Sequence, residues 1–304
     1  MRWVVRAGDG NTVREMLVLA GADADALGEG RVFLGRRRLK EGSEPVVPGD
    51  EVNVVSRPQT DGLRAPILVR TVDLVAVDKP SGIPTIADHG GSSHALTALV
   101  ARAIGVESDL VHPTSRLDRD VSGVVIFALT KDAAHRLAVA RARGTYERRY
   151  VAIASHAPAS VGTGTWNAPI GRTRNPRLRA INGRDPVPAT THFALCARAP
   201  TGSALFAFAP VTGRTHQIRV HSAHAGAALI GDRSYGGVVR LTLPSGRVIE
   251  PGRIALHAAR VVVPDEENRP VAVTSVVPLA LRELWATLGG DGSAWELATS
   301  CRLD

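Results

Sequence analysis

The segment HPTSRLDRDVSGVVIFALT, residues 112–130, contains one carboxylate between two arginines, directly before an apolar run. Asp118 lies between Arg116 and Arg119, and the residues that follow are apolar enough to form a buried strand. A nearby arginine keeps an aspartate ionised, which is the state that a nucleophile or general base requires. The alternative is a structural ion pair with no reactive role. Asp118 is therefore a candidate catalytic group.

A second polar segment, TGRTHQIRVHSAHAG at residues 212–226, is the most informative part of the chain. Thr215 can cap a helix over residues 216–225, and Gly226 would end it. Arg219 then lies one turn from the helix N-terminus, where backbone donors and the helix dipole favour anions. Arg219 is accordingly a candidate charge partner for Asp118.

The histidines of this segment could also indicate a zinc site. His216 and His221 would point about 140° apart around a helix. His221 and His224 could converge, but no HExxH pattern or comparable carboxylate partner is present. The chain also lacks a GxSxG elbow and a Gly-rich loop ending in GK[ST]. We therefore expect no metal site, and Asp118 remains the reactive candidate.

The composition favours a polyanionic partner. The chain has 304 residues, of which 44% are hydrophobic and 22% charged, and its formal net charge is +8. Lys40, Lys79 and Lys131 are the only lysines, so nearly all cations are arginines, whose planar fork suits phosphates and base edges. Cys196 and Cys301 have no metal-type spacing, and no run reaches membrane length. We expect a cytoplasmic protein without disulfides or membrane contact.

Residues 1–57 are predicted to form a small α/β module. NTVREMLVLAG has a helical pattern with Asn11 or Thr12 as N-cap, RVFLGRRRLKEG reads as a strand pair turning at Gly35, and PGDEVNVV as a turn and a strand. This order resembles the alpha-L RNA-binding module. The resemblance implies RNA contacts by the basic cluster of the hairpin, which contains Arg36, Arg37, Arg38 and Lys40. The alternative is a solvated hairpin without a partner.

The rest of the chain is predicted to be one larger domain, residues 70–285, after a linker at 58–69 and before a tail at 286–304. TVDLVAVDKPSGIPT predicts a buried strand and a sharp turn, and KDAAHRLAVARARG a helix ending near Gly144. Strands and helices alternate without a βα period, which favours a mixed sheet. The arginine-rich stretch 172–184 is predicted to be a loop that follows a phosphate backbone. SAWELATS could form a short helix.

Several motifs in order resemble the RluA-type pseudouridine synthases. RLDRDVSGVVIFALT is similar to the family's HRLDxxTSG signature, and TGRTHQIRVHSAHAG with IGDRSYGG to its third motif. VDKPSG, RRYVAI and ALHAAR follow the family's order, over about residues 70–265. The resemblance implies an α+β fold with a mixed, mainly antiparallel sheet, flanking helices and a central catalytic cleft. It also implies isomerisation of uridine to pseudouridine in RNA without metal or cofactor.

The resemblance also implies roles for individual residues. Asp118 matches the catalytic aspartate, and Arg219 the arginine that pairs with it. Tyr150 matches the ring that stacks on the extruded uracil and is proposed as a base. Its alternative is an ordinary strand tyrosine in the core. The side chains implied to approach RNA are Arg116, Arg119, Arg214, His216 and Gln217.

Two positions depart from the family pattern and keep other functions open. Ser115 stands where the signature has histidine, and Val121 where it has threonine. A rival hypothesis is therefore an RNA-binding protein or chaperone that has lost turnover, and a third is a metal-dependent nuclease. For an active enzyme, the module favours ribosomal RNA, from the large subunit, over transfer RNA. We expect a monomer.

Overall fold

The computed structural model describes residues 2–22, 24–39, 41–55, 65–87, 94–243, 247–301 and 303. Contacts divide the chain into two units, Met1–Ala65 with Ile83–Val111 and Pro66–Gly82 with His112–Asp304. The predicted linker lies mostly outside the described residues, and its C-terminal end forms part of β5 (Ile67–Arg70). Within the described residues no helix has the length and apolarity needed to span a bilayer.

The N-terminal segment contains the predicted helix and hairpin. Helix α1 (Val13–Leu19) begins after Thr12, whose hydroxyl accepts a hydrogen bond from the Glu15 amide. A four-stranded antiparallel sheet packs on α1 through a cluster of apolar side chains. Its strands follow the order β1 (Arg2–Val4), β4 (Glu51–Val54), β2 (Val32–Leu34) and β3 (Arg37–Arg38). The turn at Gly35, with φ of +58°, confirms the predicted hairpin. Also in the first unit are η1 (Ala24–Ala26), α2 (Leu96–Ile104) and η2 (Ser108–Leu110).

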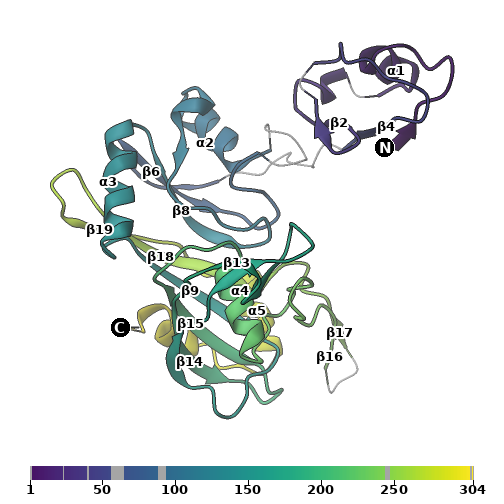
Figure 1. Ribbon diagram of the computed structural model, residues 1–304. Helices are drawn as coiled ribbons and strands as arrows, with labels where there is room; N and C mark the ends of the chain where they lie inside the picture. Colours follow the sequence, from purple (N-terminus) through teal and green to yellow (C-terminus); the bar gives the residue numbers. More distant parts are fainter. Residues whose placement is uncertain are drawn as a thin grey trace. The chain divides into compact units, whose positions relative to one another are not determined.

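A ten-stranded mixed sheet forms the centre of the second unit (Figure 1). All its pairs are antiparallel except β8 with β18, which confirms the predicted fold class. The main path runs β10 (Thr163–Trp166), β14 (Thr191–Arg198), β15 (Ala204–Pro210), β9 (Glu147–Ala154), β18 (Leu256–Pro264), β8 (Ser122–Ala128), β6 (Leu74–Lys79) and β5. β19 (Pro270–Thr274) pairs with β18, and β7 (His112–Pro113) with β8.

Helices cover this sheet through distinct apolar clusters. α3 (Lys131–Ala142) packs on β6, β8 and β18, and Arg143 is its C-cap. α5 (Leu279–Thr287) and α6 (Ala294–Ser300) pack on Val151 and Ile153 of β9 through Trp285 and Trp295. The helix predicted in SAWELATS is thus confirmed as α6. Residues assigned to the tail contribute to the core.

The arginine-rich stretch 172–184 is the predicted loop only over residues 173–178, which include Arg174 and Arg177, and strands flank this loop. These strands belong to a three-stranded sheet of β11 (Ile170–Arg172), β12 (Arg179–Ile181) and β13 (Arg184–Val187). Strands of three or four residues leave too short a pattern to recognise in sequence. Asn182, between β12 and β13, and Asp185, within β13, both have positive φ angles. Asparagine and aspartate are typical of turns, so their presence favours a loop prediction. A separate pair, β16 (Leu241–Thr242) and β17 (Val248–Ile249), completes the described strands.

The parallel pairing of β8 with β18 depends on a glycine and a buried histidine. Gly123 has φ of +118°, and a Cβ on it would lie 2.3 Å from the Ala258 carbonyl oxygen, so no other residue fits. The neighbouring Ser122 hydroxyl lies 2.8 Å from Nδ1 of His257 and accepts a bond from Arg253. The serine and glycine of the DVSGVV segment therefore join the two strands.

His257 should make folding stability depend on pH. Its pKa is lowered from 6.5 to about 4, mainly by burial and also by the positive charge of Arg253, while a hydrogen bond with the Ser275 backbone acts in the opposite direction. Between these values the unfolded chain binds a proton that the folded chain does not. Stability is then fully present above pH 6.5 and is lost as pH falls through 4, by roughly 3 kcal/mol in all. The free energy of unfolding, measured by urea denaturation at several pH values in this window, should change less with pH for His257→Gln than for the wild type. An equal pH dependence of both proteins would contradict the assignment.

Candidate active site

Asp118 lies on the loop that enters β8, and its side chain is 28% exposed. Its Oδ2 accepts a hydrogen bond of 2.7 Å from Nη1 of Arg219, 101 residues later in the chain. Its Oδ1 lies 3.8 Å from Nε2 of His216. The two segments that sequence analysis selected separately therefore meet at one carboxylate, which is partly open to solvent.

Arg219 joins Asp118 to a second, buried carboxylate. Its Nε and Nη2 donate to the two oxygens of Asp232 at 2.7 and 2.8 Å, and Asp232 is 1% exposed. The guanidinium also lies over the ring of Tyr235, at 4.9 Å from the centroid. Burial alone would lower the pKa of Arg219, but the hydrogen bonds and charges of Asp232 and Asp118 raise it instead. Arg219 is thus a fixed, permanently charged donor to Asp118.

Lys79 secures the loop that carries Asp118. Its ammonium is fully buried and donates to three backbone carbonyls, those of Pro80, Arg119 and Val121, at 2.7 to 3.0 Å. Burial lowers the pKa of Lys79 to about 7, although the charge of Asp118 acts in the opposite direction. Because Arg119 and Val121 follow Asp118 closely in the chain, Lys79 fixes the backbone on the C-terminal side of the carboxylate.

Tyr150 lies on β9 and is 8% exposed. Val151 and Ile153 face α5 and α6, so alternation turns Tyr150 to the other side of the sheet. Its cross-strand partner Phe208 lies near Trp166, whose ring contacts His221 of α4 (Gln217–His224). Tyr150 therefore faces the side on which α4 lies. Burial raises the pKa of Tyr150, and the charge of Asp118 raises it further, so its hydroxyl is protonated at neutral pH.

The start of α4 differs from the prediction. Thr215 does not cap the helix; the N-cap is His216, in the left-handed conformation with φ of +60° and without a side-chain capping bond. This conformation turns the His216 ring toward Asp118 and Tyr235, with Nδ1 at 2.7 Å from the Tyr235 hydroxyl. The local preference for a threonine cap is therefore overridden by contacts of the histidine ring.

The side chains expected to approach RNA fall into two groups. Arg116, Arg119 and Arg214 are exposed, with Arg214 donating to the Pro188 carbonyl. Gln217, in contrast, is 4% exposed, and its amide is used within the protein. The carbonyl accepts from the Thr212 hydroxyl and the Arg214 amide, and the nitrogen donates to the Thr190 carbonyl and the Thr191 hydroxyl. In this structure Gln217 is not available to RNA and instead holds the 212–217 turn.

Sequence reasoning gave no role to Asp232, Tyr235 or Lys79. The first two lie in IGDRSYGG and the third in VDKPSG, segments that the resemblance had already included. Their placement within these motifs was a usable signal, but most of their partners are 13 to 56 residues away in the chain. In the part of the chain that the structure describes, no group of three histidine, cysteine or acidic residues could hold a metal ion.

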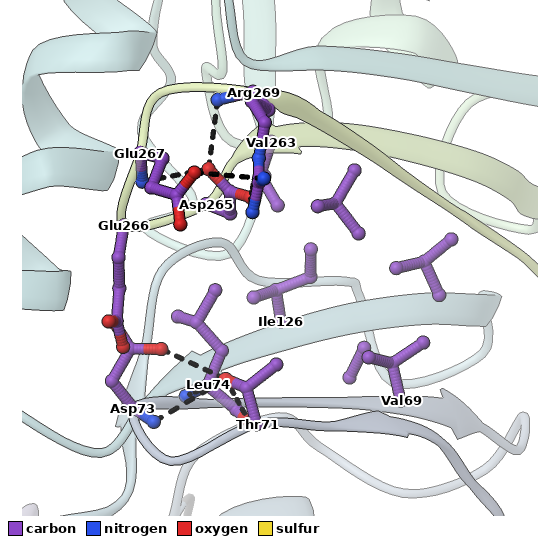
Figure 2. Close-up of a pocket in the computed structure, with 13 residues that line it drawn as sticks. Val69, Thr71, Asp73, Leu74, Ile126, Val263, Asp265, Glu266, Glu267 and Arg269 are labelled. Carbon is purple, nitrogen blue, oxygen red and sulfur yellow. Dashed lines mark hydrogen bonds and ion pairs between the residues drawn. The ribbon is translucent and has the colours of Figure 1, made fainter.

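A separate cavity of about 180 Å³ lies beneath the β18–β19 turn (Figure 2). Its floor includes Leu74, Ile126 and Val263, which belong to the core cluster beneath α3. Its rim is acidic, but Asp265 and Glu267 are paired with Arg269 at 2.8 Å. None of the candidate catalytic residues lines this cavity. It is a gap at the edge of the core rather than a part of the site.

The comparison with known proteins identifies the class of this chain. A family model described as RNA pseudouridylate synthase matches residues 73–224, which contain Asp118, Tyr150 and Arg219. The chain belongs to the RNA pseudouridylate synthase family, whose members are isomerases that act on RNA. The predicted family and class of activity are thereby confirmed.

Individual relatives agree with this assignment. The chain is 33% identical over 292 residues to ribosomal large subunit pseudouridine synthase D of Xanthomonas campestris, covering 90% of this chain and 84% of the relative. It is 30% identical over 229 residues to an uncharacterized RNA pseudouridine synthase of Zymomonas mobilis, covering 72% and 99%. The structure of human RNA pseudouridylate synthase domain containing 4 shares the fold, with a TM-score of 0.58, 22% identity and coverage of 73% and 92%.

Proposed function

We propose that this protein converts uridine to pseudouridine in large-subunit ribosomal RNA, with Asp118 as the catalytic carboxylate. The observation that carries the proposal is the chain of contacts from Asp118 through Arg219 to the buried Asp232. It holds one accessible carboxylate in a fixed orientation. The printed name of the Xanthomonas relative supports the large subunit as the source of the RNA.

The chemistry requires an extruded nucleotide. A uridine stacked in RNA is out of reach, and turning it out costs a few kcal/mol. The bond from ribose C1′ to uracil N1 then breaks, the base rotates and C5 bonds to C1′. The proton on C5 leaves and N1 takes up a proton, so the product is an isomer of uridine. Asp118 acts either by covalent attack on C1′ or by removing a proton from the sugar. Arg219 donates to one oxygen of Asp118 and leaves the other to react.

Tyr150 is proposed to stack on the extruded uracil. Stacking of a base on an aromatic ring contributes roughly 1–3 kcal/mol. The raised pKa of its hydroxyl makes a tyrosinate rare at neutral pH, which favours stacking and hydrogen bonding over proton removal. This refines the role that the family resemblance implied for Tyr150.

The RNA strand is proposed to contact exposed arginines of both units. Near the site these are Arg116, Arg119 and Arg214, and the arginines of the β11–β13 sheet extend the basic surface. In the proposed alpha-L module, residues 1–57, Arg36, Arg37 and Arg38 would bind phosphates.

The further domain limits that we propose are a catalytic domain over 70–285 and a C-terminal segment over 286–304. We also propose a cytoplasmic monomer.

The rival, an RNA-binding protein without turnover, draws on Ser115 and Val121. Both residues have contacts within the protein that speak for the enzyme instead. The Ser115 hydroxyl lies 3.4 Å from the Tyr146 hydroxyl, and Val121 is 2% exposed with its carbonyl bound to Lys79. Since the loop is anchored without the usual histidine and threonine, these changes do not favour the rival.

A direct test uses RNA from cells that lack the gene. Purified protein is incubated with separated ribosomal and transfer RNA, and pseudouridine is mapped by carbodiimide treatment and primer extension. New stops in large-subunit ribosomal RNA are expected. Stops confined to transfer RNA would overturn the proposed substrate, and no stops in either RNA would overturn the proposed activity.

A further inference from the structure

Tyr235 connects the arginine-bearing sheet to the Asp118 site. Its hydroxyl oxygen accepts a hydrogen bond of 3.0 Å from the backbone amide of Arg179, at the start of β12. The same oxygen lies 2.7 Å from Nδ1 of His216, whose Nε2 faces Oδ1 of Asp118 at 3.8 Å. A continuous polar path therefore leads from a backbone amide of β12 to the carboxylate.

The donor at one end of this path favours one protonation state of the histidine at the other end. The Arg179 amide can only donate, so the Tyr235 oxygen accepts there and its own proton is free to point to Nδ1 of His216. Nδ1 of His216 is then the acceptor, and the proton of the neutral ring lies on Nε2. The opposite tautomer would turn the bare Nε2 lone pair toward a carboxylate, which is electrostatically unfavourable. Hydrogen-bond partners thus select one tautomer.

Burial favours the neutral form of the His216 ring, and the charged groups around it act in both directions. Burial lowers the pKa of His216; Arg219 and Arg179 lower it further, and Asp118 and Asp232 act in the opposite direction. Tyr235 is a further polar neighbour of the ring. A neutral ring with the proton on Nε2 presents a positive hydrogen to Oδ1, while Arg219 binds Oδ2. At 3.8 Å the contact is longer than a hydrogen bond and acts electrostatically.

We propose that Tyr235 is a positioning residue that holds His216 in the Nε2–H tautomer and so orients the Asp118 carboxylate for reaction. The effect on rate rests on the proposed function, whereas the tautomer does not. Tyr235 also supports Arg219 through its ring, so one residue positions the partners of both carboxylate oxygens. The hydroxyl and the ring can be tested separately.

The test is Tyr235→Phe, which removes the hydroxyl and keeps the ring under Arg219. Long-range ¹H–¹⁵N spectra of ¹⁵N-histidine-labelled protein report the tautomer, with His216 assigned by its loss in His216→Gln. Wild-type protein should give the Nε2–H pattern and the variant a shift toward Nδ1–H. The single-turnover rate should fall about tenfold, which corresponds to a barrier rise of about 1.4 kcal/mol, with RNA affinity unchanged.

Thr165→Val is the matched control, because it removes an exposed hydroxyl 2.7 Å from Nδ1 of the half-buried His192, outside the site. It should alter the His192 signals and leave the rate unchanged. A wild-type His216 in the Nδ1–H form, or a Tyr235→Phe variant with the wild-type tautomer or the wild-type rate, would overturn the inference. Inactive wild-type protein with the expected tautomer shift would instead overturn the proposed function.

A second pair of variants covers the case in which Tyr235→Phe does not fold. Glutamine at position 216 can place an N–H near the position of Nε2, whereas asparagine reaches only that of Nδ1. His216→Gln should therefore retain more of the rate than His216→Asn, although the left-handed backbone at this position favours asparagine. The reverse order would overturn the inference.

Discussion

Asp118→Asn should abolish most pseudouridine formation without weakening RNA binding. The amide preserves the size of the side chain and can still accept a bond from Arg219, but it cannot act as a nucleophile or base. We expect the single-turnover rate to fall by about 10³-fold, within the range of a positioned acid–base group. Tritium release from [5-³H]uridine RNA measures the rate, and filter binding measures affinity.

Asp120→Asn is the matched control for this experiment. The residue is exposed, lies two positions from Asp118 and undergoes the same chemical change. Its variant should modify RNA at close to the wild-type rate. Undiminished modification by Asp118→Asn would refute the catalytic assignment. Rescue of a gene-deletion strain by that inactive variant would show that RNA binding is the biological role, as the rival hypothesis holds.

Arg219→Met should have the largest effect on stability. The change leaves the Asp232 carboxylate, which is 1% exposed, without its cation. Removing one partner of a buried pair typically costs about 3–5 kcal/mol, because the remaining charge stays buried and uncompensated. Turnover should fall as well, since Asp118 loses the hydrogen bond from Arg219, which Asp232 holds in place. The free energy of unfolding from urea titration measures the first effect, and tritium release the second.

The double variant Arg219→Met with Asp232→Asn separates the two effects. Neutralising position 232 removes the unpaired charge, so most of the lost stability should return. Activity should not return, because Asp118 still lacks its partner. A single variant as stable as wild type would contradict the buried pair. A double variant with wild-type turnover would contradict the role of Arg219 at Asp118.

Part of the site could be predicted from the sequence. Asp118 and Arg219 each lie in a recognisable motif of neighbouring residues, and the structure places their side chains 2.7 Å apart. Gln217 lies in the same motif as Arg219 but is used within the fold, since its amide binds Thr190 and Thr191 where β14 begins. Asp232 and Tyr235 had no assigned role, because the sequence around a carboxylate or a phenol in a turn does not indicate which distant residue it binds.

The sequence by itself determined the family, the mixed α+β fold, the N-terminal hairpin and the carboxylate–arginine pair. These follow from local periodicity, turn residues and ordered motifs, all of which are properties of neighbouring residues. Only the tertiary structure decided that Arg172, Arg179 and Arg184 lie on paired strands, that His216 is the N-cap of α4 with a left-handed backbone, and that Lys79 fixes the Asp118 loop. Each depends on hydrogen bonds between segments distant in the chain, whose free energy outweighs local preference.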